Sequence, residues 1–324
     1  MPETSRGLVE WVPVAMPGQG SLPGHYIREM RSYAKAVAAT VGVDFDVSYA
    51  QGMTGLALLN GPFPVMVNLH GLNMFFQAHT AKQWLTQRML QPIARQMLAA
   101  DSLVSLGGEL TEMLMSAGCD QTRIVNLSNA LDPEEIPEKL PLSRLNPEIG
   151  RPPRFVLVGR HEPAKGFDVL IAALEMMDLA IDLDLVGEWP DLVSPPHRVK
   201  HHGVVMDRID LMQTFDQADV LLSASYSEGM PTVVLEAMAR GLAVVATDVG
   251  AVRELVDEET GWCVPAGDPE ALAEAMTAAA WAEPSVLQSM GEKAHKKVQR
   301  YTWPRIADET VKALEAMISQ WKSR

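Results

Sequence analysis

Two glutamates flank the point where a loop turns into a helix in the segment SEGMPTVVLEAMARG. Pro231 suits the first turn of a helix, where its missing N–H would have no partner in any case. The free N–H groups at Thr232 and Val233, with the positive end of the helix dipole, can hold a phosphate. Glu228, in the loop, can accept hydrogen bonds from sugar hydroxyls, and Glu236, farther along the helix, can reach a ribose. The segment therefore suits an anionic ligand.

A structural interpretation of the same segment stays open. An acidic residue beside a helix N-terminus favours the helix dipole, and a glutamate farther along a helix is commonly only solvated. Two glutamates alone favour this interpretation. The ligand site therefore depends on further residues that reach the same place.

Two cations follow the first strand that we expect in the second half of the chain. The segment VGRHEPAKG carries Arg160 and Lys165 after the apolar run RFVLV. Ligands of open α/β sheets bind at the carboxyl ends of the strands, so both cations would lie where a diphosphate is held and would neutralise its charge. Each cation alone is more often a solubilising residue. Their shared sheet edge with Glu228 favours the functional interpretation.

The elements that would present these residues alternate along the second half. RFVLVGR, IDLDLVGE, HRVKHHGVV, DVLLSAS and LAVVATDVG predict strands. The stretch from Val169 to Met177, IDLMQTFDQA and PTVVLEAMARG have helical spacing, the last one capped by Gly241. Alternating strands and helices are typical of βαβ units and a parallel sheet. From Arg151 onward we expect one doubly wound α/β domain.

The first half is less regular, and it predicts a second α/β unit. PVMVNLHG and DSLVSLG read as strands, with a helix from Ala81 to Ala100 between them. The segment LDPEEIPEKLPLSRLNPEIGRPP, rich in proline and charge, predicts a linker with a boundary near Gly150. YTWPRIADETVKALEAMISQW predicts a helix after Pro304. The expected domains are 1–148, 149–300 and a terminal helix within 301–324.

Composition excludes several classes of protein. The 324 residues include 27 basic and 41 acidic ones, a formal charge of −14, which argues against a nucleic-acid-binding surface. Cys119 and Cys263 are too few for a disulfide framework or a cysteine zinc site, and both are expected to be small buried residues of a reducing compartment. No signal peptide and no apolar run long enough to span a bilayer is apparent. We expect a cytoplasmic protein, with peripheral membrane contact left open.

Two further groups of residues resemble metal sites. Asp182 and Asp184 resemble a metal-binding DxD motif, but the alternation of Ile181, Leu183 and Leu185 predicts a strand. The neighbouring His201 and His202 would point to opposite sides of a strand and so share no metal. Both groups are therefore interpreted as structural.

Taken together, these pieces resemble the donor domain of the family 4 retaining glycosyltransferases. The resemblance rests on VGR, AKG, VGE, HGVV, DVLLSASYSEGMPTVVLEAMARGLAVVATDVGAVRELV and GWCVPAGDPEALAEAM in this order, from about Arg151 to Met276. It implies a GT-B fold, in which two Rossmann-like domains face each other across a cleft. It also implies transfer of a hexose from a nucleotide-diphosphate sugar, such as a UDP or GDP sugar, with retention at the anomeric carbon and without a metal or cofactor.

The resemblance also implies roles for individual residues. Arg160 and Lys165 would bind the diphosphate, Glu228 with the backbone after it would hold the sugar, and Glu236 would bind the ribose. Gly203, Val204 and Val205 would lie in the region that contacts the nucleobase. The implied catalytic residues are His70, Arg160, Lys165 and Glu228. The implied donor-binding residues are Gly159, Arg160, Lys165, Val204, Glu228, Gly229, Met230, Pro231, Thr232, Val233 and Glu236.

The first half matches the family less closely. VMVNLHG resembles the strand at which these enzymes present a histidine to the cleft, so His70 is the candidate there, although a lone histidine is more often structural. NLSNALDPEEI resembles the stretch before the interdomain linker, with Ala130 where the family commonly has glycine. YTWPRIADE resembles the helix that returns to the N-terminal domain.

The main departure from the family is at the start of the chain. FDVSYAQG resembles a later strand of the N-terminal domain, so we expect this domain to be incomplete and to lack its opening strand and glycine-rich loop. PGQGSLPGH could be a displaced glycine-rich loop, but it reads better as a cluster of turns.

Two functions therefore compete. The first is an active hexosyltransferase whose hydroxyl acceptor is a sugar, a lipid-linked sugar or a small aglycone. The alternative is a catalytically weak or inert nucleotide-sugar-binding protein. A sugar-nucleotide epimerase of similar fold is disfavoured by the EGMPTVVLE segment. The oligomeric state stays open, with a homo-oligomer as one possibility.

Overall fold

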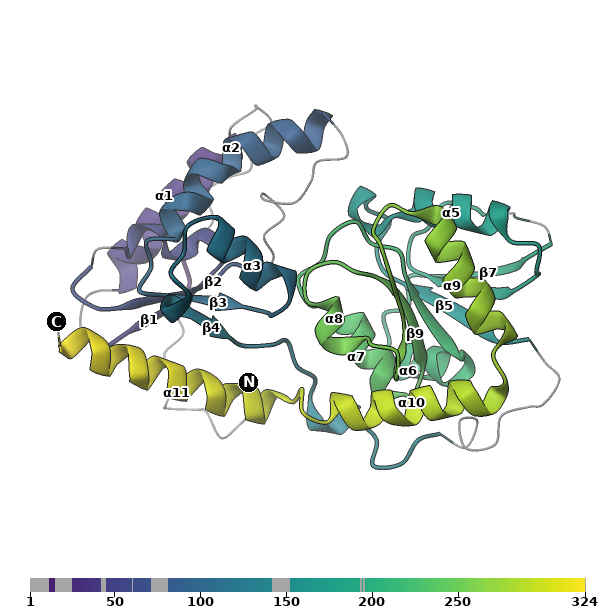
Figure 1. The fold of residues 1–324 in the computed structure, drawn as a ribbon. Coiled ribbons are helices and arrows are strands. Elements are labelled where there is room, and N and C mark those ends of the chain that lie inside the picture. Colours follow the sequence, from purple (N-terminus) through teal and green to yellow (C-terminus); the bar gives the residue numbers. More distant parts are fainter. Residues whose placement is uncertain are drawn as a thin grey trace. The chain divides into compact units, whose positions relative to one another are not determined.

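The chain folds into two compact units (Figure 1). The computed structural model describes residues 12–14, 25–41, 45–59, 61–70, 81–141, 152–192, 194 and 196–323. The first unit comprises the residues up to Ser105, Met113–Asn126 and Val311–Arg324, and the second comprises Leu106–Glu112 and Leu127–Thr310. The predicted boundary near Gly150 lies outside the described residues. Each unit is described by itself below.

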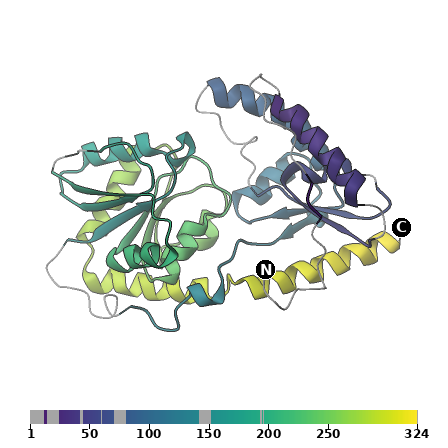
Figure 2. The same cartoon turned by 180° about the vertical axis from the view of Figure 1, so that it is seen from behind.

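The first unit is built on a parallel sheet whose described strands follow each other in chain order. They are β1 (Ser48–Gln51), β2 (Val65–Asn68), β3 (Ser102–Ser105) and β4 (Ile124–Asn126). Figures 1 and 2 show α1 (His25–Val41) and α2 (Ala81–Met97) on one side of this sheet and the end of α11 (Trp303–Lys322) on the other. The Lys322 Nζ atom lies 3.3 Å from Asp46 Oδ1, just before β1.

These elements confirm the α/β pattern predicted for the first half. PVMVNLHG and DSLVSLG form β2 and β3, and FDVSYAQG includes β1. All of the segment PGQGSLPGH except its last residue, His25, lies outside the described residues. The expectation of a missing opening strand and loop therefore stays a prediction. The other elements in the described part of this half are α3 (Glu109–Ser116) and the short 3-10 helices η2 (Gly52–Ala57), η3 (Gln121–Arg123) and η4 (Pro133–Glu135).

The second unit is a doubly wound sheet, as predicted. Its parallel strands are β5 (Arg154–Val158), β6 (Asp182–Val186), β7 (Arg198–Gly203), β8 (Val220–Ser223), β9 (Ala243–Thr247) and β10 (Gly261–Val264), in the order β10-β9-β8-β5-β6-β7. The chain leaves β5 toward β6 and β7 and later returns to its other side at β8. This reversal creates a topological switch point, where open α/β sheets bind their ligands.

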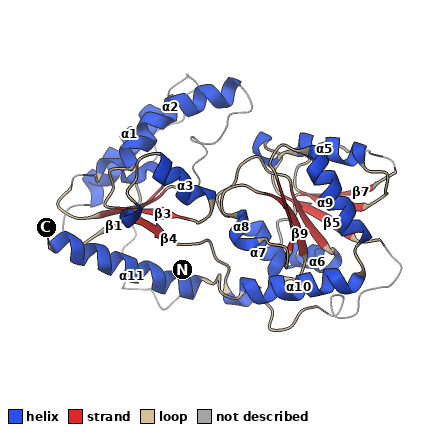
Figure 3. Ribbon diagram, in the orientation of Figure 1, coloured by secondary structure: helices blue, strands red, loops and turns tan. Residues whose placement is uncertain are grey.

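Helices cover both faces of this second sheet (Figure 3). They are η5 (Pro163–Lys165), α5 (Phe167–Met176), α6 (Arg208–Gln217), α7 (Thr232–Ala239), α8 (Val252–Leu255), α9 (Pro269–Trp281) and α10 (Pro284–Val298). Helix α5 packs against α9, and α7 packs against α10. Because both faces are covered, the consecutive residues Phe155, Val156 and Leu157 of β5 are all at most 4% exposed. None of the described helices is both long and apolar enough to cross a bilayer.

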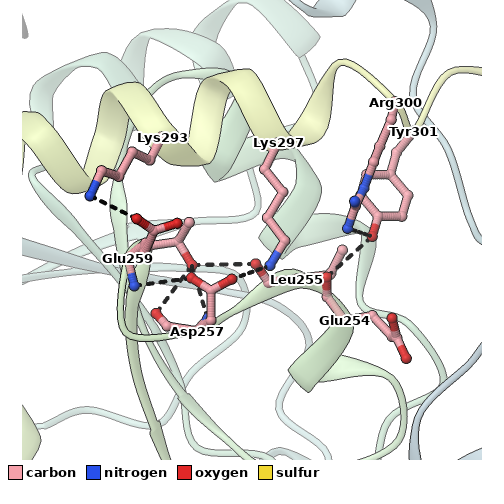
Figure 4. Close-up of polar contacts among 9 residues, drawn as sticks. Glu254, Leu255, Asp257, Glu259, Lys293, Lys297, Arg300 and Tyr301 are labelled. Carbon is pink, nitrogen blue, oxygen red and sulfur yellow. Dashed lines mark hydrogen bonds and ion pairs between the residues drawn. The ribbon is translucent and has the colours of Figure 1, made fainter.

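Ion pairs and hydrogen bonds fasten α10 to the turn between α8 and β10 (Figure 4). Lys297 Nζ lies 2.6 Å from Asp257 Oδ2, and Lys293 Nζ lies 3.1 Å from Glu259 Oε1. The Tyr301 hydroxyl donates to the Glu254 carbonyl at 3.2 Å. The two ion pairs hold the turn, and the hydrogen bond from Tyr301 holds α8 itself.

Candidate functional site

A cavity of about 600 Å³ opens at the carboxyl ends of β5, β6 and β8, at the switch point of the second sheet. Nine of the eleven predicted donor-binding residues line it, which are Gly159, Arg160, Lys165, Val204, Glu228, Met230, Pro231, Thr232 and Val233. Val205, which belongs to the predicted nucleobase region, also lines it. Sequence reasoning assigned no site role to the other lining residues, Asn129, Val158, Val186, Gly187, Glu188 and Leu211. The two charged motifs therefore meet at one edge of the sheet, where the rule for open α/β sheets places them.

An ion pair between the two predicted motifs lies in the lining of this cavity. Lys165 Nζ lies 2.8 Å from Glu228 Oε1, and the Ser225 hydroxyl donates to the same oxygen at 2.6 Å. The side chains of Lys165 and Glu228 are 28% and 13% exposed, so water screens their attraction less than it would at a free surface. The pair places a cation and a hydroxyl-binding carboxylate side by side.

Backbone contacts explain why the loops that carry this pair meet. Gly166 has a left-handed conformation (φ 64°), and a Cβ atom there would lie 1.9 Å from the Ala224 carbonyl oxygen. The Tyr226 N–H donates to the Ala164 carbonyl at 2.8 Å, and its hydroxyl donates to Asp168 Oδ2 at 2.9 Å. Burial, together with the bond to Asp168, raises the pKa of Tyr226 to about 12. The loop after β5 is thereby held against the loop after β8.

The N-terminus of α7 forms the anion-binding wall of the cavity. The helix begins at Thr232 with Pro231 as its N-cap, one position later than predicted, because Pro231 has an extended conformation. Thr232 and Val233 line the cavity, so their first-turn N–H groups can bind an anion there. The Asn129 side-chain amide donates to the Met230 carbonyl at 2.7 Å and so supports the loop that leads into α7.

Gly229 supports this loop from behind and is not a lining residue. Its carbonyl accepts a hydrogen bond of 2.8 Å from the Ala251 N–H. The preceding Gly250 has a φ of 59°, and a Cβ atom there would lie 2.3 Å from the Glu228 carbonyl oxygen. Only glycine fits this close approach of two backbones.

Arg160 lines the cavity, but its guanidinium forms an ion pair with Glu162 on the same loop. Its Nη2 atom lies 3.1 Å from Glu162 Oε1, and its side chain is 87% exposed. The Arg160 guanidinium can therefore turn toward an anionic ligand at little cost, because an exposed ion pair stabilises a protein only slightly.

Glu236 is placed beside the cavity rather than in its lining. It lies on α7, one helical turn after Thr232 and Val233, and its Oε1 atom accepts a hydrogen bond of 2.9 Å from Arg208 Nη1. Burial raises the pKa of Glu236, and Arg208 opposes this rise. Sequence reasoning missed Arg208, which directly precedes the segment IDLMQTFDQA that was interpreted only as a helix.

His70 follows β2 in the first unit and is exposed. It has a left-handed backbone (φ 59°), which is uncommon for a residue other than glycine, and its N–H donates to Asn68 Oδ1 at 2.8 Å. Residues 71–80, which come directly after it, lie outside the described part of the chain. The role predicted for His70 stays a prediction.

The apparent metal motifs are part of the sheet, as predicted. Asp182 and Asp184 lie in β6, where Asp184 pairs with His202 at 2.9 Å, while His201 accepts a hydrogen bond from the Leu192 N–H. The two histidines thus have separate partners. Within the described ranges, no group of three histidine, cysteine or acidic residues is arranged to hold a metal ion.

Comparison with known proteins identifies the domain that carries the cavity. Residues 152–280 match the family model described as "Glycosyl transferases group 1". This part of the chain is a glycosyl transferases group 1 domain. The group 1 domain contains every lining residue of the cavity except Asn129.

The chain is also similar to individual proteins. A phosphatidyl-myo-inositol mannosyltransferase of Mycobacterium leprae is 31% identical over 204 residues, which are 57% of this chain and 54% of that protein. Sucrose-phosphate synthase of Thermosynechococcus elongatus has a TM-score of 0.76 at 20% identity, covering 95% of this chain and 83% of that one. HepE of Anabaena in complex with UDP-glucose has a TM-score of 0.66 at 20% identity, covering 90% and 83%.

These likenesses show that the fold is of the GT-B type. The chain spans about half the length of most of the curated relatives it matches, including 54% of the mannosyltransferase.

Proposed function

We propose that the chain is a retaining glycosyltransferase of the family 4 type, which transfers a hexose from a nucleotide-diphosphate sugar to a hydroxyl acceptor. The observation that carries the proposal is the Lys165–Glu228 pair in a cavity walled by the N-terminus of α7. A cation, a hydroxyl-binding carboxylate and free N–H groups are the groups that recognise a sugar joined to a diphosphate. The match of residues 152–280 to the group 1 family supports it.

In this proposal the diphosphate lies between the first turn of α7 and the two cations. Arg160 leaves Glu162 and joins Lys165 at the phosphate oxygens, while Glu228 accepts hydrogen bonds from the hexose hydroxyls. A cavity of about 600 Å³ is within the usual size range of small-molecule sites. A uridine nucleotide is the first donor to test, because a protein of similar fold is known in complex with UDP-glucose.

The proposed chemistry is stabilisation of the leaving group. As the bond from the anomeric carbon to the diphosphate oxygen breaks, its electron pair stays on the diphosphate. The acceptor oxygen forms the new bond to the anomeric carbon and passes its proton to the departing diphosphate. Negative charge therefore grows where Lys165, Arg160 and the α7 dipole point, so these groups bind the transition state more tightly than the donor. These fixed positive charges would replace a metal ion. His70 is the proposed contribution of the first unit to substrate contacts.

A panel of donors tests this function. UDP-glucose, UDP-galactose, UDP-N-acetylglucosamine, GDP-mannose and ADP-glucose are added separately, and thermal stabilisation and release of free nucleotide are measured for each. We expect one nucleotide class to raise the melting temperature and to be turned over slowly by hydrolysis even without acceptor. Stabilisation without any turnover, including with mixed sugar acceptors, would favour the inert binding protein. If no donor stabilises the chain, the proposed function is wrong.

A further inference from the structure

We propose that Arg208 is a positioning residue, which holds the carboxylate of Glu236 in place for the ribose of the donor nucleotide. The proposal rests on the proposed function, because it assumes that Glu236 accepts hydrogen bonds from the ribose hydroxyls. Arg208 belongs to α6, outside the motifs that suggested the donor site.

The backbone at Arg208 is fixed by a helix cap. Arg208 is the first residue of α6, and Asp207 Oδ1 before it accepts hydrogen bonds from the N–H groups of Ile209 and Asp210 at 2.7 and 3.3 Å. Such a cap orders the first turn of the helix, so the backbone position from which the Arg208 side chain extends is fixed.

The guanidinium joins three separate segments of the second unit. Its Nη1 atom donates to Glu236 Oε1 on α7 at 2.9 Å, and its Nε atom donates to Glu135 Oε1 in η4 at 2.8 Å. The planar fork of arginine suits two such directional bonds, which a lysine cannot reproduce. Arg208 therefore determines where the Glu236 carboxylate lies relative to α6 and η4.

Two of these segments, α6 and α7, also line the cavity. Leu211, one turn after Arg208 on α6, is a lining residue, and so are Thr232 and Val233, one turn before Glu236 on α7. Residues three or four apart share one face of a helix. The Arg208–Glu236 pair thus continues the cavity wall beyond the phosphate-binding turn of α7. This is where the nucleoside of a bound diphosphate sugar would extend.

The electrostatics leave Glu236 able to bind a hydroxyl. Two acids, Glu135 and Glu236, share one cation, and the Glu236 side chain is only 14% exposed. Among the described residues, only Arg208 bonds the Glu236 carboxylate, at Oε1, so Oε2 can accept from a diol. Burial raises the pKa of Glu236, Arg208 lowers it, and the charge of Glu135 raises it. Without Arg208, Glu236 would be protonated at higher pH and would lose acceptor strength.

A thermodynamic cycle between protein and ligand separates this role from a purely structural ion pair. Affinities for UDP and for 2′,3′-dideoxy-UDP are measured by calorimetry on the wild type, Arg208→Met, Arg208→Lys and Glu236→Ala. GDP and its dideoxy form are used instead if the wild type prefers guanosine nucleotides. We expect Arg208→Met to weaken UDP binding on the order of tenfold and to leave dideoxy-UDP binding unchanged, because the lost contact serves the ribose hydroxyls. Arg208→Lys should restore only part of the loss.

A matched control is Arg198→Met. Arg198, like Arg208, makes two hydrogen bonds to acidic side chains, but both go to Asp182 on β6, and neither residue lines the cavity. The Arg198→Met variant should bind UDP and dideoxy-UDP with the affinities of the wild type. Circular dichroism melts on all variants show whether the fold is retained.

The pH dependence is a second readout. The UDP affinity of Arg208→Met is divided by that of the wild type at each pH, so that titration of the nucleotide cancels. This ratio should decrease as the pH is lowered from 8 to 5.5, because Glu236 is protonated more readily without Arg208. Glu135→Gln should show the opposite trend, because removing its charge lowers the pKa of Glu236.

Each outcome of these measurements has a defined meaning. Equal losses for UDP and dideoxy-UDP, or no loss for UDP, would overturn the positioning role. If Glu236→Ala discriminates the two nucleotides but Arg208→Met does not, only this inference fails and the proposed function stands. If the wild type binds none of the uridine, guanosine and adenosine nucleotides, the proposed function fails with it.

Discussion

Lys165 and Glu228 lie 63 positions apart in sequence, yet the Lys165 ammonium and the Glu228 carboxylate form an ion pair of 2.8 Å at the switch point of a parallel sheet. Each side chain follows a different strand, β5 or β8, and these two strands are neighbours in the sheet. The cation and the acid are therefore parts of one site, and a change at either residue should affect both the sugar and the phosphate of a bound donor.

Replacing Lys165 by Met should lower turnover more than it raises the Michaelis constant for the donor. The charge on the departing diphosphate grows as the glycosidic bond breaks, so the lost interaction is largest in the transition state. We expect kcat to fall on the order of 100-fold. Steady-state kinetics with the preferred donor checks this. The control is Lys293→Met, which removes an ammonium on α10 that pairs with Glu259. A rise in the Michaelis constant alone would assign Lys165 to ground-state binding.

Replacing Glu236 by Ala should weaken nucleotide binding by about 1.5 to 3 kcal/mol, because the ribose would lose a charged hydrogen-bond acceptor. Calorimetry with UDP, GDP and ADP measures the loss. Glu259→Ala, which removes an exposed carboxylate from the turn in Figure 4, should leave affinity unchanged. Equal affinity of wild type and Glu236→Ala for all three nucleotides would rule out the ribose role.

Replacing Gly250 by Ala should destabilise the group 1 domain by about 1 to 3 kcal/mol. The new Cβ would meet the carbonyl oxygens of Glu228 and Gly229 at 2.3 and 2.4 Å, and φ is positive. The loop must then shift, so nucleotide affinity should fall as well. Gly118→Ala is the matched control, because Gly118 also has a positive φ but no atom within 4 Å of its Cβ position. Denaturant titration should show the larger loss for Gly250→Ala.

Alkaline pH should weaken the contact between Tyr226 and Asp168. The pKa of Tyr226 is raised to about 12 by burial and by the hydrogen bond to Asp168, above the value of about 10 for an unfolded tyrosine. Stability from this raised pKa is fully present below pH 10 and is lost as pH rises toward 12, because the unfolded chain releases the proton first. The free energy of unfolding of the wild type, measured against Tyr226→Phe, should be constant from pH 7 to 9 and fall above pH 10. A constant difference up to pH 11 would contradict the shift.

A chelator should leave nucleotide binding and turnover intact. In the proposed mechanism, the charge of the diphosphate is neutralised by Lys165, Arg160 and the α7 dipole, which EDTA does not remove. Donor hydrolysis is compared before and after dialysis against EDTA, and again after magnesium or manganese is added. Activity that EDTA abolishes and either metal restores would show that a metal takes part.

The sequence by itself determined the doubly wound fold of the second half and most of the lining of its cavity. Alternating apolar runs and helical spacing identify βαβ units, because a strand buried on both faces needs an uninterrupted apolar run. Connection rules then place the carboxyl ends of parallel strands at one edge. Arg160, Lys165 and Glu228 follow such strands, so their convergence could be inferred without coordinates.

Only the tertiary structure decided which side chains pair within and beside that cavity. Glu236 was readable as a helical acid, but its partner Arg208 is on another helix, 28 positions away, and no local pattern marks it. The Asn129 contact to the Met230 carbonyl joins residues 101 positions apart. Such contacts depend on how α6, α7 and the segment before η4 pack in three dimensions. Because packing distances of a few ångströms decide a hydrogen bond, a pattern that predicts each element separately cannot predict these pairs.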